Sequence, residues 1–186
     1  VLVDSALEAV SRGSTTIGIK TSTFALISSH VKPTKPLVES SEKIFTIDGH
    51  VGATESGYIG DILQLIDEIQ LAAQKHRLTY ESPVDISLLA KHLSPVDISS
   101  HLHNYTIDAV RPHAASIIIA GIDQTGVQLY QVDPSGTFFP GAGFAIGQYS
   151  DIALDVIQRE YSADMSAEAI RLGNKGIEKA LGEKHW

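Results

Sequence analysis

A glycine followed by three hydroxyl side chains, close to the start of the chain, is the stretch with the clearest potential for chemistry. Gly13 precedes Ser14, Thr15 and Thr16, and an alternating apolar segment follows. A hydroxyl becomes an effective nucleophile only when a neighbouring base takes its proton, so a catalytic cluster needs such a base. The same residues are also typical of the start of a strand, which β-branched threonines favour. Both interpretations stay open on these residues alone.

The histidines, eight in all, are the second set of candidates, as metal ligands. His101 and His103 are two residues apart, and His92 lies nine residues before the first of them. On a helix, residues two apart point in different directions and do not easily share a metal. No carboxylate cluster completes a site, and the chain has neither cysteine nor a phosphate loop of the GxxxxGK type. The sequence therefore predicts no metal site and no cofactor.

Composition limits the classes of protein that remain. The chain has 186 residues, of which 43% are apolar and 19% charged, so we expect one globular domain over residues 1–186. The formal charge of −8 disfavours a nucleic-acid partner. No apolar run approaches the roughly 20 residues of a membrane helix, so no membrane partner is expected. The lack of cysteine favours an intracellular, cytoplasmic protein. The first residue is Val1 rather than Met, and we expect the chain to be truncated there.

The elements that would position these residues begin with a helix over residues 3–12, which ends at Gly13. Period-2 alternation predicts four strands in the first part of the chain, at residues 14–21, 23–31, 43–47 and 50–54. Asp48-Gly49 joins the last two as a hairpin turn. An apolar stripe predicts a long helix within residues 57–77.

A second helix is expected to begin at Ser82, as the N-cap, with Pro83 in its first position. The segment SPVDIS occurs at residues 82–87 and again at 94–99, and Pro95 predicts that two short helices meet there.

Further strands are predicted at residues 115–123, 127–132 and within 141–150, and two helices at residues 150–161 and 166–181. The strand at 115–123 reads as buried on both faces, and the strand after it leads into a turn at residues 133–136. The helix at 150–161 has Ser150 or Asp151 as its expected cap. This order of strands, two helices, strands and two helices predicts an α+β sandwich of antiparallel sheets with helices outside it.

Five segments together carry a resemblance to a known family: LEAVSRGSTTIGIKT, EKIFTID, YTIDAVRP, AGIDQTGVQLYQVDPSGTF and AIGQYS. In this order the chain resembles the α-type subunit of the 20S proteasome from about residue 3 to residue 182. The resemblance implies the four-layer αββα sandwich of N-terminal-nucleophile hydrolases. It also implies a non-catalytic subunit that builds the outer ring, gates substrate entry and docks activators for ATP-dependent protein degradation.

The same resemblance implies the partners. These would be other α subunits in a seven-membered ring, β-type subunits, and the C-terminal tails of ATPase or other activators. Ring assembly would use the helix at residues 3–12 and the long helix at residues 61–77. If the source is eukaryotic, the resemblance also implies a nuclear location.

The chain departs from the family pattern in four places. The family's Lys-Asp-Gly hairpin after the first strand is replaced by a shortened STFALISSH, and the segment around residues 94–99 is a few residues too long. The upstream helix with its gating residues is missing, and the chain stops at KALGEKHW, where the family continues into two last strands. The first two departures concern the contacts within the ring, and the last two are those expected of a truncated chain.

Ser14 carries the alternative function, a divergent self-processing amidohydrolase or peptidase. In the catalytic β-type relatives, the residue after the glycine is a threonine freed by self-cleavage, and its own amine serves as the base. Ser14 holds that position. Lys43 aligns with the lysine that lowers the pKa of the nucleophile there, and Gly57 aligns with a glycine of the oxyanion hole.

The remaining catalytic parts are absent from the sequence. No carboxylate stands at residues 28–29, where the acidic partner is expected, and Gln148 replaces a supporting serine. The helix at residues 3–12 leaves Ser14 inside the chain, without a free amine. We therefore expect no catalytic residue; a stand-alone binding module that kept the fold is a third alternative.

Lys43 has a second role under the same resemblance. An exposed lysine at a strand edge is the plain interpretation. In α rings, however, this lysine lines a pocket between neighbouring subunits and binds the C-terminal carboxylate of an activator tail. Gly13 and Gly57 match backbone positions of that pocket, so the resemblance implies an activator-binding site at Lys43, Gly13 and Gly57. The family's leucine after the second glycine is Tyr58 here.

Overall fold

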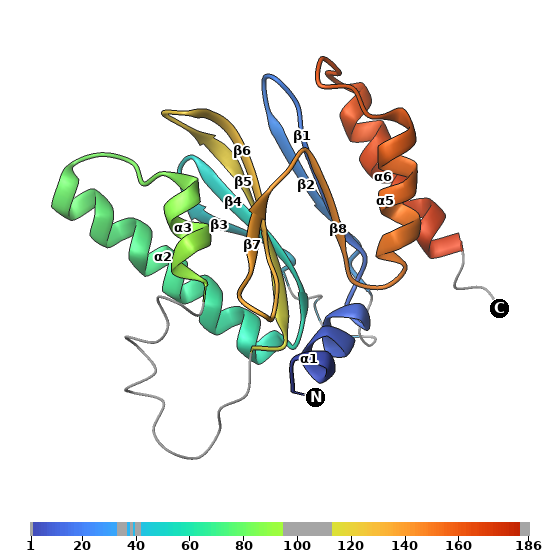
Figure 1. The fold of residues 1–186 in the computed structure, drawn as a ribbon, viewed down its shortest axis with the longest axis horizontal. Helices are drawn as coiled ribbons and strands as arrows, with labels where there is room; N and C mark the ends of the chain where they lie inside the picture. The colour runs from blue at the N-terminus through green and yellow to red at the C-terminus, as the bar shows by residue number, and fades with distance from the viewer. Residues whose placement is uncertain (1, 33–36, 38, 40–41, 95–112, 183–186) are drawn as a thin grey trace.

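Two antiparallel sheets face each other, and helices cover the outer side of each (Figure 1). We describe this arrangement from a computed structural model, which describes residues 2–32, 37, 39, 42–94 and 113–182. The layers therefore follow the order helix, sheet, sheet, helix, and the predicted α+β sandwich is confirmed.

The smaller sheet has three strands in the described part of the chain, in the order β2-β1-β8. Strand β1 (Thr16–Lys20) pairs antiparallel with β2 (Ala25–Ser29) on one side and with β8 (Gly143–Ile146) on the other. The N-terminal segment is thus joined directly to a strand from the last third of the chain.

The larger sheet has five strands in sequence order, and each pairs antiparallel with the next. Its members are β3 (Ile44–Asp48), β4 (Val51–Gly57), β5 (Ala115–Asp123), β6 (Gly126–Val132) and β7 (Phe138–Pro140). Because each strand pairs with its neighbour in sequence, short turns set most of the register.

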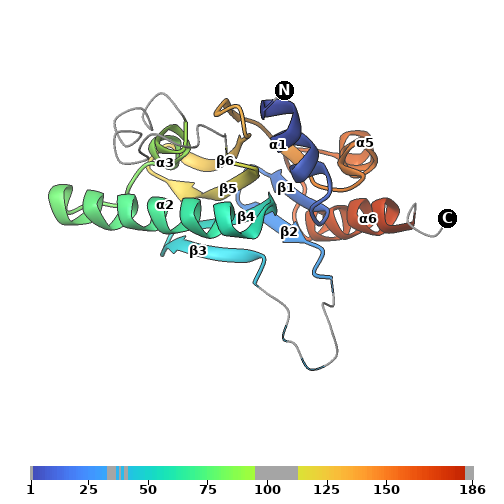
Figure 2. The ribbon, with the colours of Figure 1, turned by 90° about the horizontal axis from the view of Figure 1, so that it is seen from below.

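The helices form two groups on the two outer faces (Figures 1 and 2). Helices α2 (Ile59–Tyr80) and α3 (Ile86–His92) cover the five-stranded sheet, and α5 (Ser150–Glu160) and α6 (Glu168–Gly182) cover the three-stranded sheet. Helix α1 (Leu2–Ser11) lies at one end of the sandwich (Figure 2).

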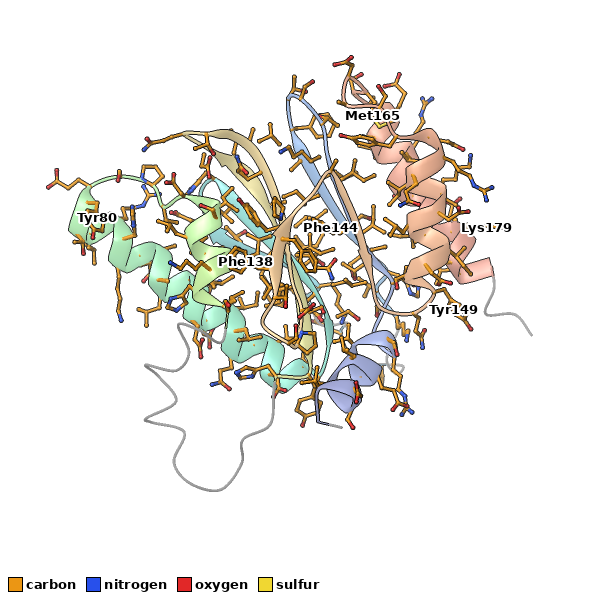
Figure 3. The ribbon with its side chains drawn as sticks, in the orientation of Figure 1. Tyr80, Phe138, Phe144, Tyr149, Met165 and Lys179 are labelled. Carbon is orange, nitrogen blue, oxygen red and sulfur yellow. The ribbon has the colours of Figure 1, made fainter. Side chains whose placement is uncertain are left out.

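Three apolar cores fill the three spaces between the four layers. Strand β5 shows how the sequence builds two of them, because its side chains alternate between the faces of the sheet. Ile117 and Ile119 pack under α2 and α3, whereas Ile118 packs between the two sheets. The aromatic rings follow the same division: Phe144 lies between the sheets and Phe138 on the side of α2 and α3 (Figure 3). Burying each such isoleucine contributes about 1.5–3 kcal/mol.

Two predicted helix starts are wrong. Helix α3 begins at Ile86 rather than at Ser82-Pro83, because its Ile86 N–H donates to the carboxylate of Asp123, the last residue of β5, at 2.9 Å. Helix α5 is preceded by Tyr149 in the left-handed region (φ 53°), and neither Ser150 nor Asp151 is its N-cap. At the start of α3, a side chain from a distant strand overrides the local capping signal.

Most other elements agree with the predictions, and strand β7 is one that the sequence did not indicate. The turn after β6 is confirmed by a hydrogen bond of 2.8 Å from Gly136 N to Asp133 O. The second SPVDIS copy, the YTIDAVRP segment, His101 and His103 fall largely or wholly outside the described residues. Among the described helices, none has the length and apolar character needed to cross a membrane.

Candidate functional site

The segment between α1 and β1 is held in place by its backbone on both sides. The N–H of Gly13 donates to the carbonyl of Val10 at 3.0 Å, and the carbonyl of Gly13 accepts from the N–H of Gln148 at 2.9 Å. Ser14 follows and is only 5% exposed. Its nitrogen is the amide of the Gly13–Ser14 peptide bond, and an amide nitrogen does not act as a base.

The two threonines use their hydroxyls on backbone groups, as expected for the start of a strand. The Thr15 hydroxyl donates to the carbonyl of Gln148 at 2.7 Å. The Thr16 hydroxyl lies 3.2 Å from the carbonyl of Glu55 and 2.7 Å from the hydroxyl of Ser29. These bonds tie the start of β1 to the segment after β8, to β2, and across the sandwich to β4. For Thr15 and Thr16, the interpretation as strand-start residues is confirmed.

Gly13 and Gly57 lie directly against each other. A Cβ atom on Gly13 would stand 2.0 Å from the hydroxyl oxygen of Ser56 and 2.9 Å from the nitrogen of Gly57. Gly57 has φ +138°, and a Cβ atom on it would stand 2.1 Å from the carbonyl oxygen of Ala114. The Ser56 hydroxyl also donates to the carbonyl of Val10 at 2.9 Å. The end of α1 is thus packed onto the end of β4, where only glycine fits.

Lys43 lies next to this contact, directly before the neighbouring strand β3. Because Ile44 pairs with Thr54, Lys43 stands opposite Glu55. Glu55 lies two residues before Gly57 on β4. The Lys43 ammonium donates to Glu55 Oε1 at 2.7 Å. The side chain of Lys43 is 16% exposed and that of Glu55 is 0% exposed. The interpretation of Lys43 as an ordinary exposed lysine is therefore wrong.

Glu55 is a carboxylate on an apolar face. It pairs with Ile117 across the β4–β5 ladder, and directly paired residues share a face of the sheet. That face carries the core under α2 and α3. Burial raises the pKa of Glu55, and the hydrogen bond and positive charge of Lys43 oppose this only in part, so the pKa stays above its ordinary value. Glu55 Oε2 is buried and has no hydrogen-bond partner among the described residues.

Sequence reasoning missed Glu55, although a signal for it was present. In VGATESG the core-facing positions are Val51, Ala53 and Glu55, so a charged residue stands where the alternation calls for an apolar one. A buried charge at such a position requires a partner. Residues 28–29 are serines, and the acid beside Lys43 comes from β4 instead.

The remaining predicted residues surround this corner. Tyr58 is 59% exposed and directly precedes α2, and its N–H donates to the carbonyl of Ala114 at 2.8 Å. Gln148, which replaces the supporting serine, meets Gly13 and Thr15 through its backbone. Gly13, Lys43 and Gly57 are therefore brought to one end of the sandwich, where Figure 1 shows α1 beside the ends of the strands.

An open groove of about 500 Å³ lies elsewhere, between the β3–β4 hairpin and the start of β2. Its lining includes Phe24, Ile27, Asp48 and His50, and none of Gly13, Lys43 and Gly57. Within the residues that the structure describes, no three His, Asp or Glu side chains come together in a way that could hold a metal ion.

Comparison with known proteins identifies relatives over nearly the whole chain. Residues 10–185 match the protein family described as Proteasome subunit. Proteins named Proteasome subunit alpha from Methanopyrus kandleri and Methanosarcina acetivorans are 35% and 36% identical; each alignment covers 98% of this chain and 74% and 73% of the relative. One of the same name from Saccharolobus islandicus is 37% identical over 96% of this chain and 74% of the relative.

Proposed function

Because the chain belongs to the proteasome subunit family, we propose that it is a non-catalytic α-type subunit that builds the outer ring of the 20S particle, gates substrate entry and docks activators. The name that its relatives share, Proteasome subunit alpha, supports the α type. Its partners are other α subunits, β-type subunits and activator tails, its place is the cytoplasm, and catalysis belongs to the β subunits.

One observation carries the docking part of this proposal: a largely buried ammonium stands beside two glycines whose backbones are closely packed. Lys43 supplies a positive charge on a side chain that is 16% exposed, and a carboxylate is its natural ligand. Gly13 and Gly57 are half-buried and pack against each other at the same end of the molecule. A peptide that ends in a carboxylate is the ligand this arrangement suits.

Ring assembly is supported by apolar side chains that α1 and α2 leave exposed. Leu7 on α1 is 43% exposed, and Leu63 and Leu71 on α2 are 48% and 50% exposed. Exposed leucines on a helix otherwise packed against a sheet favour contact with another protein. Neighbouring α subunits are the partners we propose for both helices.

The absence of catalysis in this chain is supported by the surroundings of Ser14. A nucleophile needs a base and access to substrate, whereas Ser14 is 5% exposed and follows a peptide bond. The hydroxyls next to it are engaged with backbone carbonyls. These features favour a structural role for the whole segment.

The proposal is tested in particles assembled with β subunits. Lys43→Ala should reduce the stimulation of peptide hydrolysis by a tail-docking activator and leave the rings intact in negative-stain images. Lys43→Ala combined with Glu55→Gln avoids leaving a buried carboxylate without its partner. Lys175→Ala is the matched control, because Lys175 forms an exposed pair with Glu160 on the α5–α6 layer. Undiminished stimulation in both Lys43 variants would refute docking at Lys43.

A further inference from the structure

The ammonium assigned to activator docking already has a partner inside the chain. Lys43 Nζ lies 2.7 Å from Glu55 Oε1, and Glu55 is fully buried. The pair has no net charge, so the site does not present an unopposed positive charge to a ligand. A peptide carboxylate that binds Lys43 must therefore share or displace the bond to Glu55.

We propose that Glu55 is a specificity-determining residue of the docking site, an internal counter-ion with which the C-terminal carboxylate of a peptide must compete for Lys43. The inference rests on the proposed docking function. It predicts that the chain binds free-carboxylate tails weakly in its wild-type form, and that removal of the Glu55 charge strengthens that binding.

Burial makes the competition one-sided. Glu55 lies on the face of β4 that packs under α2 and α3, and its side chain is 0% exposed. Within the described part of the chain, Lys43 is the charged group that faces it. A second carboxylate at Lys43 would stand close to this buried negative charge, and like charges in a partly buried site repel strongly. The incoming carboxylate therefore meets both an occupied donor and a repulsive neighbour.

The opposite role for Glu55 makes a different prediction. An ammonium has three N–H donors, so Glu55 could hold one and orient the other two toward a ligand. In that case, removal of the Glu55 charge would weaken tail binding. Glu55 Oε2 has no hydrogen-bond partner among the described residues, so the buried carboxylate depends on the bond that Lys43 donates to Oε1. This dependence favours competition, because a ligand that draws Lys43 away would leave Glu55 without a partner.

The experiment measures tail binding to assembled particles by fluorescence anisotropy. The probes are a fluorescein-labelled peptide from the C-terminal tail of the host's activator ATPase and the same peptide with its C-terminus amidated. Glu55→Gln keeps the size of the side chain and removes its charge. We expect it to bind the free-acid peptide about tenfold more tightly than wild type, which corresponds to about 1.4 kcal/mol.

The controls separate this effect from a general change in charge or folding. Glu160→Gln neutralises the acid of the exposed Lys175–Glu160 pair and should leave tail binding unchanged. The amidated peptide should gain little from Glu55→Gln, because it lacks the carboxylate that competes. If Glu55→Gln does not assemble, Glu55→Leu gives the same test, since an apolar side chain suits the face that Glu55 shares with Ile117.

The possible results separate competition by Glu55 from carboxylate docking at Lys43. Equal or weaker binding of the free-acid peptide by the Glu55 variants overturns competition, and docking at Lys43 still stands if Lys43→Ala weakens binding. If neither wild type nor the Glu55 variants prefer the free-acid peptide over the amide, carboxylate docking itself is overturned.

Discussion

Replacing Lys43 by methionine would leave the buried Glu55 carboxylate without its partner, and the free energy of unfolding should fall by about 3 kcal/mol at pH 7. Glu55 is 0% exposed, and its second oxygen already has no partner among the described residues. Protonation of Glu55 sets a ceiling on the loss. The ordinary pKa of Glu is 4.5, so protonation at pH 7 costs about 3.4 kcal/mol, at about 1.36 kcal/mol per pH unit.

Removing the charge of Glu55 instead, by Glu55→Gln, should change the free energy of unfolding much less. In Glu55→Gln the amide oxygen still accepts from Lys43, whose side chain is 16% exposed rather than fully buried. We expect a change of no more than about 1 kcal/mol. The double variant should then recover about 2 kcal/mol of the loss caused by Lys43→Met, since no charge is left buried.

The pH dependence provides a second check with a definite sign. Because the pKa of Glu55 is raised in the folded state, its contribution to stability is fully present below its unfolded pKa and is lost as the pH rises through its folded pKa. Glu55→Gln should therefore gain stability relative to wild type from about pH 4 to pH 7. The loss in Lys43→Met should shrink as the pH falls, because Glu55 becomes protonated.

Urea unfolding followed by far-UV circular dichroism at several pH values measures all of these quantities. Lys175→Met serves as control, because its partner Glu160 is exposed and such pairs contribute about 0–1 kcal/mol. If Lys43→Met and Glu55→Gln cost the same, and the double variant loses the sum of the two, the pair has no coupling. That result would refute the energetic coupling that we infer from the burial of the Lys43–Glu55 pair.

Two further predictions concern the corner around Gly13. Gly57→Ala should reduce the free energy of unfolding by about 3 kcal/mol or more, because its Cβ atom would stand 2.1 Å from Ala114 O at φ +138°. Gly49→Ala is the control in the same urea titration, because a Cβ atom there would have nothing within 4 Å. Equal effects of the two substitutions would contradict the close packing at Gly57. The Gly13–Ser14 bond should stay uncut, because Ser14 has neither access nor a base; intact-mass spectrometry of assembled particles checks this, and a product that begins at Ser14 would instead favour the self-processing alternative.

The sequence was sufficient to predict most elements of the fold. Alternation identified β1, a continuous apolar run identified β5, and an apolar stripe identified α2, because burial imposes a pattern on the side chains whatever their partners are. The start of α3 could not be predicted in this way. Its first N–H is satisfied by Asp123, which lies 37 residues further along the chain.

For the candidate site, too, the sequence determined some features and the tertiary structure determined others. The residue types after Gly13 indicated where chemistry could take place, and the resemblance to a family singled out Lys43 and Gly57 and supplied a role for each. Only the tertiary structure decided that Gly13 packs against Gly57 and that Lys43 is paired with Glu55, because both contacts depend on which strands lie side by side. The charge state of Glu55 depends on burial by α2 and α3, and no local pattern of residues determines it.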